Sequence, residues 1–335
     1  MKATSLIPSD RPDVLVFEQD EVRRAVPLDK ALIDAVEDSF RDLGATGVIM
    51  PPIMQFLFDE VDGQTCAKGA ACPRLPYFAV KLSSIFRRPS AARASEANGL
   101  SILLDRANGR VACVLLDHGY LTEVRTAAAS AVSIRYIAPK EVEAVAVIGS
   151  GKQAVLQAEA AFQERPWQEL RLWARRPDAA ADAAAEIGRR TGAKARPAGT
   201  REEACEGAQV IITTTTSSSP VLLADHVSPG THVVAMGSDA PGKNELDPKL
   251  LQKADLYAPD SLEQCRRYGE LAALSEIGGE ALLSRIVSLP DIVLGREQGR
   301  TSDDAITIAD HTGVGIQDTA AGNLAFTALT KTNEN

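Results

Sequence analysis

Residues 145–160, "VAVIGSGKQAVLQAEA", constrain the fold of this chain more than any other stretch. A short apolar run rich in valine leads into Gly149 and Gly151, and an alanine-rich segment follows. This order predicts a strand, a tight turn and a helix whose N-terminus can bind phosphate. Gly149 permits the turn, Gly151 lets the backbone approach a pyrophosphate, and Ala154 lets the helix pack closely on the strand. A dinucleotide site is the leading interpretation, and an ordinary strand-to-helix turn is the alternative.

The chain after Pro139 alternates between strand-like and helix-like segments. Besides the segment above, the strand-like runs are "ELRLWA", "AQVIITTT", "THVVAMG" and "ADLYAPD", with helix-like runs such as "DAAADAAAEIGRR" between them. Alternation of this kind predicts a parallel sheet with right-handed crossovers.

The N-terminal part has a different pattern. Residues 28–43 predict a packing helix capped by Asp29, and residues 121–138 predict a helix rich in small residues. Between them, residues 53–117 contain short strands of a largely antiparallel sheet, with a hairpin turn at Asn108 and Gly109. The strand-like runs there are "IMQFLF", "YFAVKL", "GLSILLD" and "VACVLLD". A chain of 335 residues is longer than one hydrophobic core usually organises, so we expect two domains.

Composition excludes several classes of protein. The net charge of −9 leaves no basic stripe for a nucleic acid. The five cysteines are scattered and the four histidines do not pair at helical spacing, which predicts reduced thiols in a cytoplasmic protein without a metal site. No apolar run approaches about 20 residues, and the first residues carry charges where a signal peptide needs apolar ones. We therefore expect a soluble cytoplasmic protein with no membrane partner.

The second strand of the alternating part bears on the choice of cofactor. A carboxylate at its end would favour the unphosphorylated ribose of NAD. Here the strand ends with Ala174, Arg175 and Arg176, and Asp178 is placed to cap the next helix. The two arginines suit a 2′-phosphate and weakly favour NADP, and a solvated arginine pair is the alternative.

Five stretches together resemble the ornithine cyclodeaminase and mu-crystallin family: "LTEVRTAAAS", "GSGKQA", "TTTTSSSPVL", "GSDAPGKNELDPKLL" and "HTGVGIQDTA". The resemblance runs in order from about residue 14 to residue 328, and it is greatest to the ectoine-utilisation and imine-reductase-like branch. It implies a Rossmann doubly wound parallel sheet, at residues 139–311, inserted in an antiparallel-sheet α+β domain for substrate binding and dimerisation. That second domain would comprise residues 1–138 and about 312–335. The resemblance also implies a homodimer and a nicotinamide cofactor, NAD or NADP, acting on small 2-amino or 2-imino acids.

The resemblance assigns roles to particular residues. Lys81 matches the lysine that holds the substrate carboxylate, Arg125 the arginine between substrate and cofactor, Asp239 the catalytic aspartate, and Thr312 a substrate contact. The cofactor-binding positions, including those proposed above from the residues themselves, are Ser95, Arg125, Gly149, Ser150, Gly151, Lys152, Gln153, Ala154, Arg175, Arg176, Thr213, Thr215, Val234, Ala235, Met236, Lys243 and His311.

Two positions depart from the family pattern. Ile53 stands where the family usually has a carboxylate-binding arginine, which argues against an ornithine-like binding mode and predicts an apolar end to the pocket. His311 stands where the family usually has a serine near the nicotinamide, and it would be either a proton donor or a polar wall.

The residues themselves suit the same chemistry. Reducing an imine needs a hydride donor, a cation for the carboxylate and a group that exchanges a proton with the nitrogen. Lys81 and Asp239 can fill the last two roles; a surface lysine and a turn-capping aspartate are the alternatives. The leading hypothesis is an NAD(P)-dependent oxidoreductase that reduces a small 2-imino acid or catalyses the reverse. The alternatives are a cyclodeaminase that uses NAD catalytically and releases ammonia, and a dinucleotide-binding protein without turnover.

Overall fold

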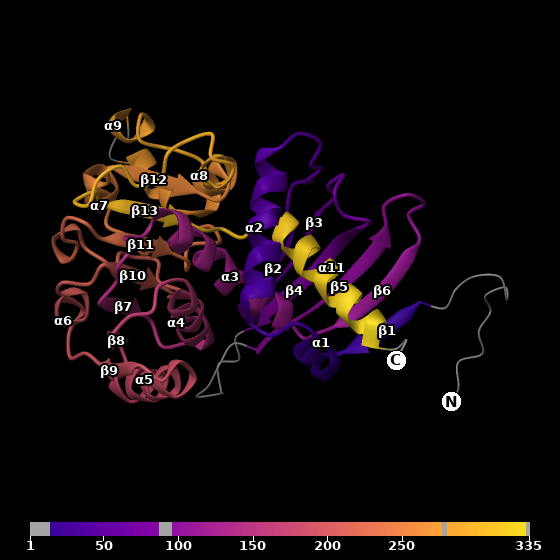
Figure 1. Cartoon of the computed structure of the whole chain (residues 1–335), viewed down its shortest axis with the longest axis horizontal. Helices are drawn as coiled ribbons and strands as arrows, with labels where there is room; N and C mark the ends of the chain where they lie inside the picture. Colours follow the sequence, from indigo (N-terminus) through magenta and orange to yellow (C-terminus); the bar gives the residue numbers. More distant parts are fainter. Residues whose placement is uncertain (1–13, 87–95, 277–279, 333–335) are drawn as a thin grey trace.

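A computed structural model describes residues 14–86, 96–276 and 280–332 of the chain. Two sheets with their helices lie side by side along the long axis of the molecule, and helix α3 (Tyr120–Ile137) lies between them (Figure 1). One sheet has six mostly antiparallel strands, and the other has seven parallel strands. The predicted fold class, a doubly wound parallel sheet inserted in an antiparallel α+β unit, is confirmed.

The six-stranded sheet has the order β1-β6-β5-β4-β3-β2, and only β1 and β6 pair in parallel. The predicted hairpin joins β5 to β6, with Gly109 at a φ of 71°. Strand β3 was not expected, because its sequence "GQTCAKGA" is polar and contains glycine. The strands are β1 (Leu15–Glu18), β2 (Met54–Phe58), β3 (Gly63–Ala70), β4 (Tyr77–Phe86), β5 (Glu96–Asp105) and β6 (Val111–Leu116).

Helices cover one face of this sheet (Figure 1). Helix α2 (Lys30–Gly44) begins where predicted, because the Asp29 side chain accepts a hydrogen bond from the Leu32 N–H. The last helix, α11 (Gly315–Thr332), returns from the far end of the chain and packs on β4 and β3. Gly322 lies so close to Leu103 that an added Cβ would be 3.0 Å from its Cδ1. Helix α1 (Gln19–Ala25) also contacts α11.

The seven-stranded sheet has the order β12-β13-β11-β10-β7-β8-β9. The order of the strands reverses between β7 and β10, and in such sheets the carboxyl ends of the strands form a ligand crevice at this point. The strands are β7 (Ala144–Ile148), β8 (Glu169–Trp173), β9 (Lys194–Pro197), β10 (Val210–Thr213), β11 (His232–Ala235), β12 (Leu256–Pro259) and β13 (Thr307–Asp310). The helices and 3₁₀ turns of this part are α4 (Lys152–Glu164), α5 (Pro177–Thr191), α6 (Arg201–Cys205), α7 (Pro248–Lys253), α8 (Leu262–Tyr268), α9 (Glu280–Leu283), α10 (Leu289–Val293), η2 (Ala224–His226) and η3 (Glu270–Glu276). The 3₁₀ turn η1 (Asp59–Val61) joins β2 to β3 in the six-stranded sheet.

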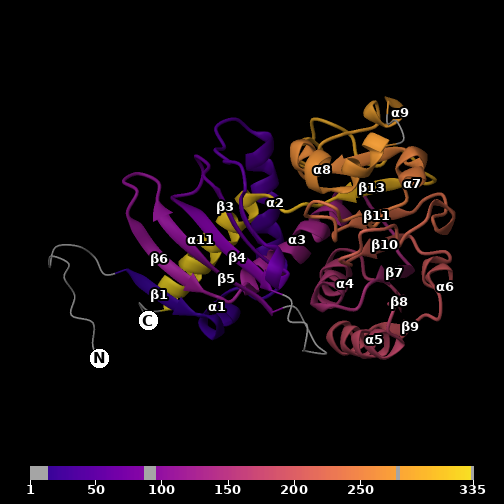
Figure 2. The ribbon, with the colours of Figure 1, turned by 180° about the vertical axis from the view of Figure 1, so that it is seen from behind.

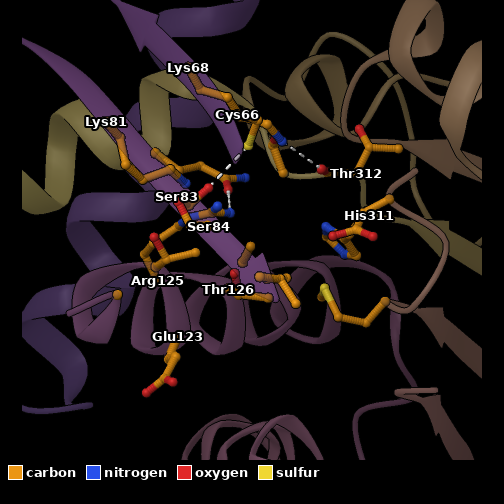
Figure 3. Close-up of a pocket in the computed structure, with 18 of the residues that line it drawn as sticks. Cys66, Lys68, Lys81, Ser83, Ser84, Glu123, Arg125, Thr126, His311 and Thr312 are labelled. Atoms are coloured by element: carbon orange, nitrogen blue, oxygen red, sulfur yellow. Dashed lines mark hydrogen bonds between the residues drawn. The ribbon is translucent and has the colours of Figure 1, made fainter. Parts of the chain in front are cut away.

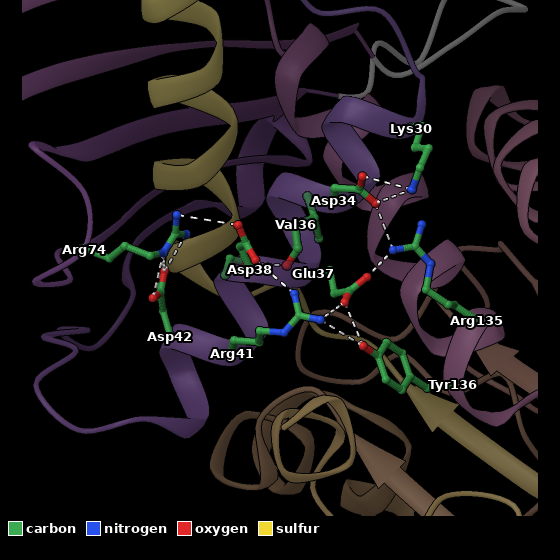
Figure 4. Close-up of polar contacts among 11 residues, drawn as sticks. Lys30, Asp34, Val36, Glu37, Asp38, Arg41, Asp42, Arg74, Arg135 and Tyr136 are labelled. Carbon is green, nitrogen blue, oxygen red and sulfur yellow. Dashed lines mark hydrogen bonds and ion pairs between the residues drawn. The ribbon is translucent and has the colours of Figure 1, made fainter. Parts of the chain in front are cut away.

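A polar network ties the helices together where the two sheets meet (Figure 4). Arg135 of α3 pairs with Asp34 and Glu37 of α2 and, at 2.6 Å, with Glu164 of α4. The Tyr136 hydroxyl donates to Glu37 at 2.7 Å. The Arg135 side chain therefore joins three helices. It holds α3 to α2, on the six-stranded sheet, and to α4, the first helix of the parallel sheet.

Candidate active site

A cavity of about 150 Å³ lies at the junction of the two sheets. Its first wall comes from β3, β4 and α3, and its second wall from the segments that follow β11 and β13 (Figure 3). The second wall is thus at the carboxyl ends of parallel strands, where α/β sheets bind ligands. Four predicted site residues with proposed substrate or catalytic roles line this junction cavity: Lys81, Arg125, Asp239 and Thr312.

Three elements converge on one buried carboxylate at the first wall. The Oδ1 of Asp318, on α11, accepts from Lys81 Nζ of β4 at 2.9 Å and from Arg125 Nε of α3 at 2.8 Å. Arg125 also donates from Nη1 to Gln317 at 2.8 Å. All three charged side chains are at most 5% exposed. Asp318 was not predicted, although it lies in "HTGVGIQDTA"; its role depends on α11 packing against α3, which the sequence pattern does not show.

Burial and neighbouring charges set the ionisation of this group. Burial lowers the pKa of Lys81 to about 8; Asp318 opposes this shift, and Arg125 and Lys68 add to it. Burial alone would raise the pKa of Asp318, but Arg125 and Lys81 lower it below its usual value. Lys81 is therefore charged near neutral pH and loses its proton more easily than a surface lysine.

Lys68 is a third cation at the first wall and was not predicted. It lies on β3 directly opposite Lys81, and its Nζ donates to the backbone carbonyls of Thr312 at 3.3 Å and Gly313 at 3.0 Å (Figure 3). The sequence could have indicated it only through β3, which was missed.

The second wall carries Asp239, Met236 and His311. Asp239 follows β11; its side chain is 48% exposed and pairs with Lys243 four residues later. Thr312 donates from its backbone N–H and from its hydroxyl to the buried Asp260, both at 2.9 Å. Asp260 thereby fixes the segment after β13.

His311 is fully buried beside this segment. Burial lowers its pKa to about 4; Asp260 opposes the shift and Arg125 adds to it. Its Nε2 lies 3.2 Å from the Ser133 hydroxyl, and its Nδ1 has no hydrogen-bond partner among the described residues. At neutral pH His311 is uncharged, so it suits a polar wall better than an acid.

The expectation that Ile53 makes one end of the pocket apolar stays a prediction. Ile53 is not among the described residues that line the cavity, whereas Gln55, on β2, is. Gln55 shares a cross-strand row with Cys66 and Ser83, so this side of the cavity is polar.

The glycine segment has the geometry that a dinucleotide needs. Gly149 has a φ of 130°, and an added Cβ would lie 2.4 Å from the Thr214 hydroxyl oxygen, so only glycine fits. Gly151 is the N-cap of α4, and a Cβ added there would meet no atom within 4 Å. No side chain caps the first turn of α4. This helix N-terminus is thus free of a side-chain cap, with open space beside Gly151.

The other predicted cofactor residues lie around the same edge of the parallel sheet. Lys152 and Gln153 bind Glu123 of α3, through its carboxylate at 2.6 Å and its carbonyl at 3.1 Å respectively. Thr213 is fully buried and its hydroxyl donates to Glu245 at 2.6 Å, so its side chain faces the interior. The buried positions are Ala154, Thr213, Val234, Ala235 and Met236; those at least partly exposed are Ser150, Lys152, Gln153, Thr215 and Lys243. Ser95 lies outside the described residues.

Arg175 and Arg176 follow β8 and are exposed. Arg176 pairs with Asp178 at 3.3 Å, and this aspartate does not cap α5, whose N-cap is Arg176 itself. The capping role expected for Asp178 is therefore wrong.

In the part of the chain that the structure describes, no three histidine, cysteine, aspartate or glutamate side chains are grouped so that they could hold a metal ion. None of the described helices is both long enough and apolar enough to cross a membrane.

Known proteins resemble this chain over nearly its whole length. The model of the ornithine cyclodeaminase/mu-crystallin family matches residues 13–333. A putative dehydrogenase of Rhizobium meliloti is 43% identical over 312 residues, which cover 93% of this chain and 94% of that protein. An archaeal alanine dehydrogenase dimer with bound NAD has a TM-score of 0.87 at 30% identity, covering 96% of this chain and 97% of that one. The iminosuccinate reductase of Paracoccus denitrificans in complex with NAD⁺ has a TM-score of 0.86 at 28% identity, with the same coverage. The chain therefore belongs to the ornithine cyclodeaminase/mu-crystallin family.

Proposed function

We propose that the chain is a nicotinamide-dependent imine reductase that converts a small 2-imino acid into the amino acid, or catalyses the reverse. One observation carries the proposal: two buried cations, Lys81 and Arg125, and the acid Asp239 line a single cavity at the carboxyl ends of the parallel strands. Two similar structures, an alanine dehydrogenase and an iminosuccinate reductase, fit the same substrate class.

The residues present fit a nicotinamide dinucleotide. Open space before Gly151, the uncapped α4 N-terminus and the tight turn at Gly149 suit a pyrophosphate. The nicotinamide would lie near Met236 and His311, which line the cavity. When bound, the cofactor supplies or accepts the hydride. We propose NADP as the preferred cofactor, weakly, because Arg175 and Arg176 are both exposed after β8.

The chain's own residues bind and orient the substrate. Lys81 and Arg125 hold the carboxylate, and Asp318 fixes both cations in position. Asp239 exchanges a proton with the substrate nitrogen as the adjacent carbon gains or loses the hydride. His311 and Met236 exclude water from the reacting atoms.

The proposal is tested with a panel of 2-oxo acids mixed with ammonia or methylamine, while the absorbance of NADH or NADPH is followed. Asp239→Asn keeps the shape of the side chain but cannot exchange the proton, so kcat should fall by about 100-fold or more. Cofactor affinity, measured by fluorescence titration, should not change. Asp182→Asn, an exposed aspartate on α5, is the control. Undiminished turnover by Asp239→Asn, or no cofactor oxidation by the wild type with any imine, would refute the proposal.

A further inference from the structure

Lys68, at the first wall of the junction cavity, lies beside another positive charge. It pairs in register with Lys81 across β3 and β4, and like charges placed directly opposite each other destabilise a sheet. Its Nζ is held by the carbonyl oxygens of Thr312 and Gly313, which are neutral. Among the described residues no carboxylate forms an ion pair with Lys68.

On the first wall of the cavity, the cations of the described residues outnumber the carboxylates that pair with them. Lys68, Lys81 and Arg125 line it, and the only carboxylate that pairs with any of them among the described residues is Asp318. Of the three acids that line the cavity, two pair with lysines outside it, and Asp260 accepts hydrogen bonds from neutral groups. Glu123 pairs with Lys152 and Asp239 with Lys243. Asp260 accepts from the N–H groups of Thr312 and Gly313, and so lies across that segment from Lys68.

Among the described residues, the first wall therefore carries two positive charges more than the paired carboxylate of Asp318 balances. One substrate carboxylate would leave one of them without a partner, and an unpaired charge in a half-buried site is costly. The neighbouring side chains on β2, β3 and β4 are polar, and Gln55, Gln64 and Ser83 can donate hydrogen bonds to a carboxylate beside Lys68.

Resting on the proposed function, we propose that the substrate is dianionic: a 2-imino acid with a second carboxylate on its side chain. Lys81 and Arg125 bind the carboxylate next to the imine, and Lys68 binds the carboxylate of the side chain. The cavity volume of about 150 Å³ is similar to that of a cavity that holds benzene, which favours a short side chain.

Two four-carbon 2-oxo acids test this with ammonia and reduced cofactor: oxaloacetate, a dicarboxylate, and 2-oxobutanoate, a monocarboxylate of the same length. Wild-type kcat/KM should be at least about tenfold higher with oxaloacetate. Lys68→Gln keeps a hydrogen-bond donor and removes the charge. It should lower kcat/KM for oxaloacetate by about 10- to 100-fold and change that for 2-oxobutanoate less than about threefold. Lys68→Arg should restore most of the loss, and Lys194→Met, on the edge strand β9, is the control.

A binding measurement separates failure of this inference from failure of the proposed function. Calorimetry of the cofactor-loaded protein should show tighter binding of succinate than of butyrate, and Lys68→Gln should weaken succinate alone. That result supports the inference even if no imine is reduced. An equal loss for both oxo acids in Lys68→Gln would show that Lys68 shares the first carboxylate, and would overturn the proposal. Equal binding of succinate and butyrate by the wild type would also overturn it.

Discussion

Lys81 is a charged side chain held where burial favours its neutral form. The carboxylate of Asp318 accepts hydrogen bonds from both Lys81 and Arg125, so it orients two cations from different elements. A buried ion pair of this kind contributes little net stability. In the proposed function, it presents fixed cations to an incoming carboxylate.

This environment predicts a pH limit. The pKa of Lys81 is lowered to about 8, so Lys81 is charged below that pH and neutral above it. Because binding of the carboxylate needs the charged form, kcat/KM should fall as the pH rises through about 8. Lys81→Arg should move the fall to higher pH, because an arginine keeps its charge. A kcat/KM profile for the wild type that stays flat to pH 10 would contradict this account of the site.

At the scale of elements, the turn between β7 and α4 is the feature that most directly concerns the cofactor. Gly151 has a φ of −79°, which any residue can adopt, and a Cβ there meets nothing within 4 Å. Gly151→Val should therefore fold normally but place a branched side chain in the path of the pyrophosphate. Circular dichroism should remain unchanged while calorimetry shows at least about tenfold weaker binding of NADH and NADPH. Unchanged affinity would show that the pyrophosphate does not bind at this turn.

The end of β8 carries the residues on which the proposed preference for NADP rests. If Arg176 binds a 2′-phosphate, Arg176→Glu should weaken NADPH by about tenfold or more and NADH much less, since a charge-assisted hydrogen bond contributes roughly 1.5 to 3 kcal/mol. Arg189→Glu, an exposed arginine at the other end of α5, is a matched control. Equal losses for the two cofactors, or a wild-type preference for NADH, would show that Arg176 only faces solvent.

For the whole molecule, the uncovered face of the six-stranded sheet is the main feature. Figure 2 shows the molecule from behind the view in Figure 1, and so from the other side of this sheet. The residues that alternate with the buried Ala79 and Lys81 include the exposed Val80 and Leu82, and Met54 lies in the same cross-strand row as Leu82. An apolar face of this kind on a sheet marks a protein interface. We expect a homodimer, as in the archaeal alanine dehydrogenase.

Leu82→Glu should therefore weaken or abolish the dimer, because it places a charge on the apolar face. Light scattering after gel filtration should report the monomer mass. Leu283→Glu, at an exposed leucine on α9, should leave the mass at twice that of the chain. A wild-type monomer, or a dimer that survives Leu82→Glu, would place the contact elsewhere or exclude it.

The sequence predicted local features better than long-range contacts. Strand-helix alternation predicted the parallel sheet, Asp29 the start of α2, and Gly149 the turn, because each depends on neighbours along the chain. Lys68 was missed because its place beside Lys81 depends on the register of β3 with β4. Asp318 was missed because it meets Arg125 only when α11 packs on α3, and these two residues are 193 positions apart in the chain. The predicted domain limits at residues 139 and 311 and the roles of the cofactor positions stay predictions.

The amount of cofactor oxidised per amino acid formed tests the central claim most directly. The enzyme is given an imine with NADH or NADPH in one reaction, and ornithine with catalytic NAD⁺ in another, and amino acid, ammonia and cofactor are measured. A reductase should consume reduced cofactor in amounts equal to the amino acid formed, and should make no proline from ornithine. Proline and ammonia released in equal amounts from ornithine, with no net change in cofactor, would contradict the account in favour of a cyclodeaminase.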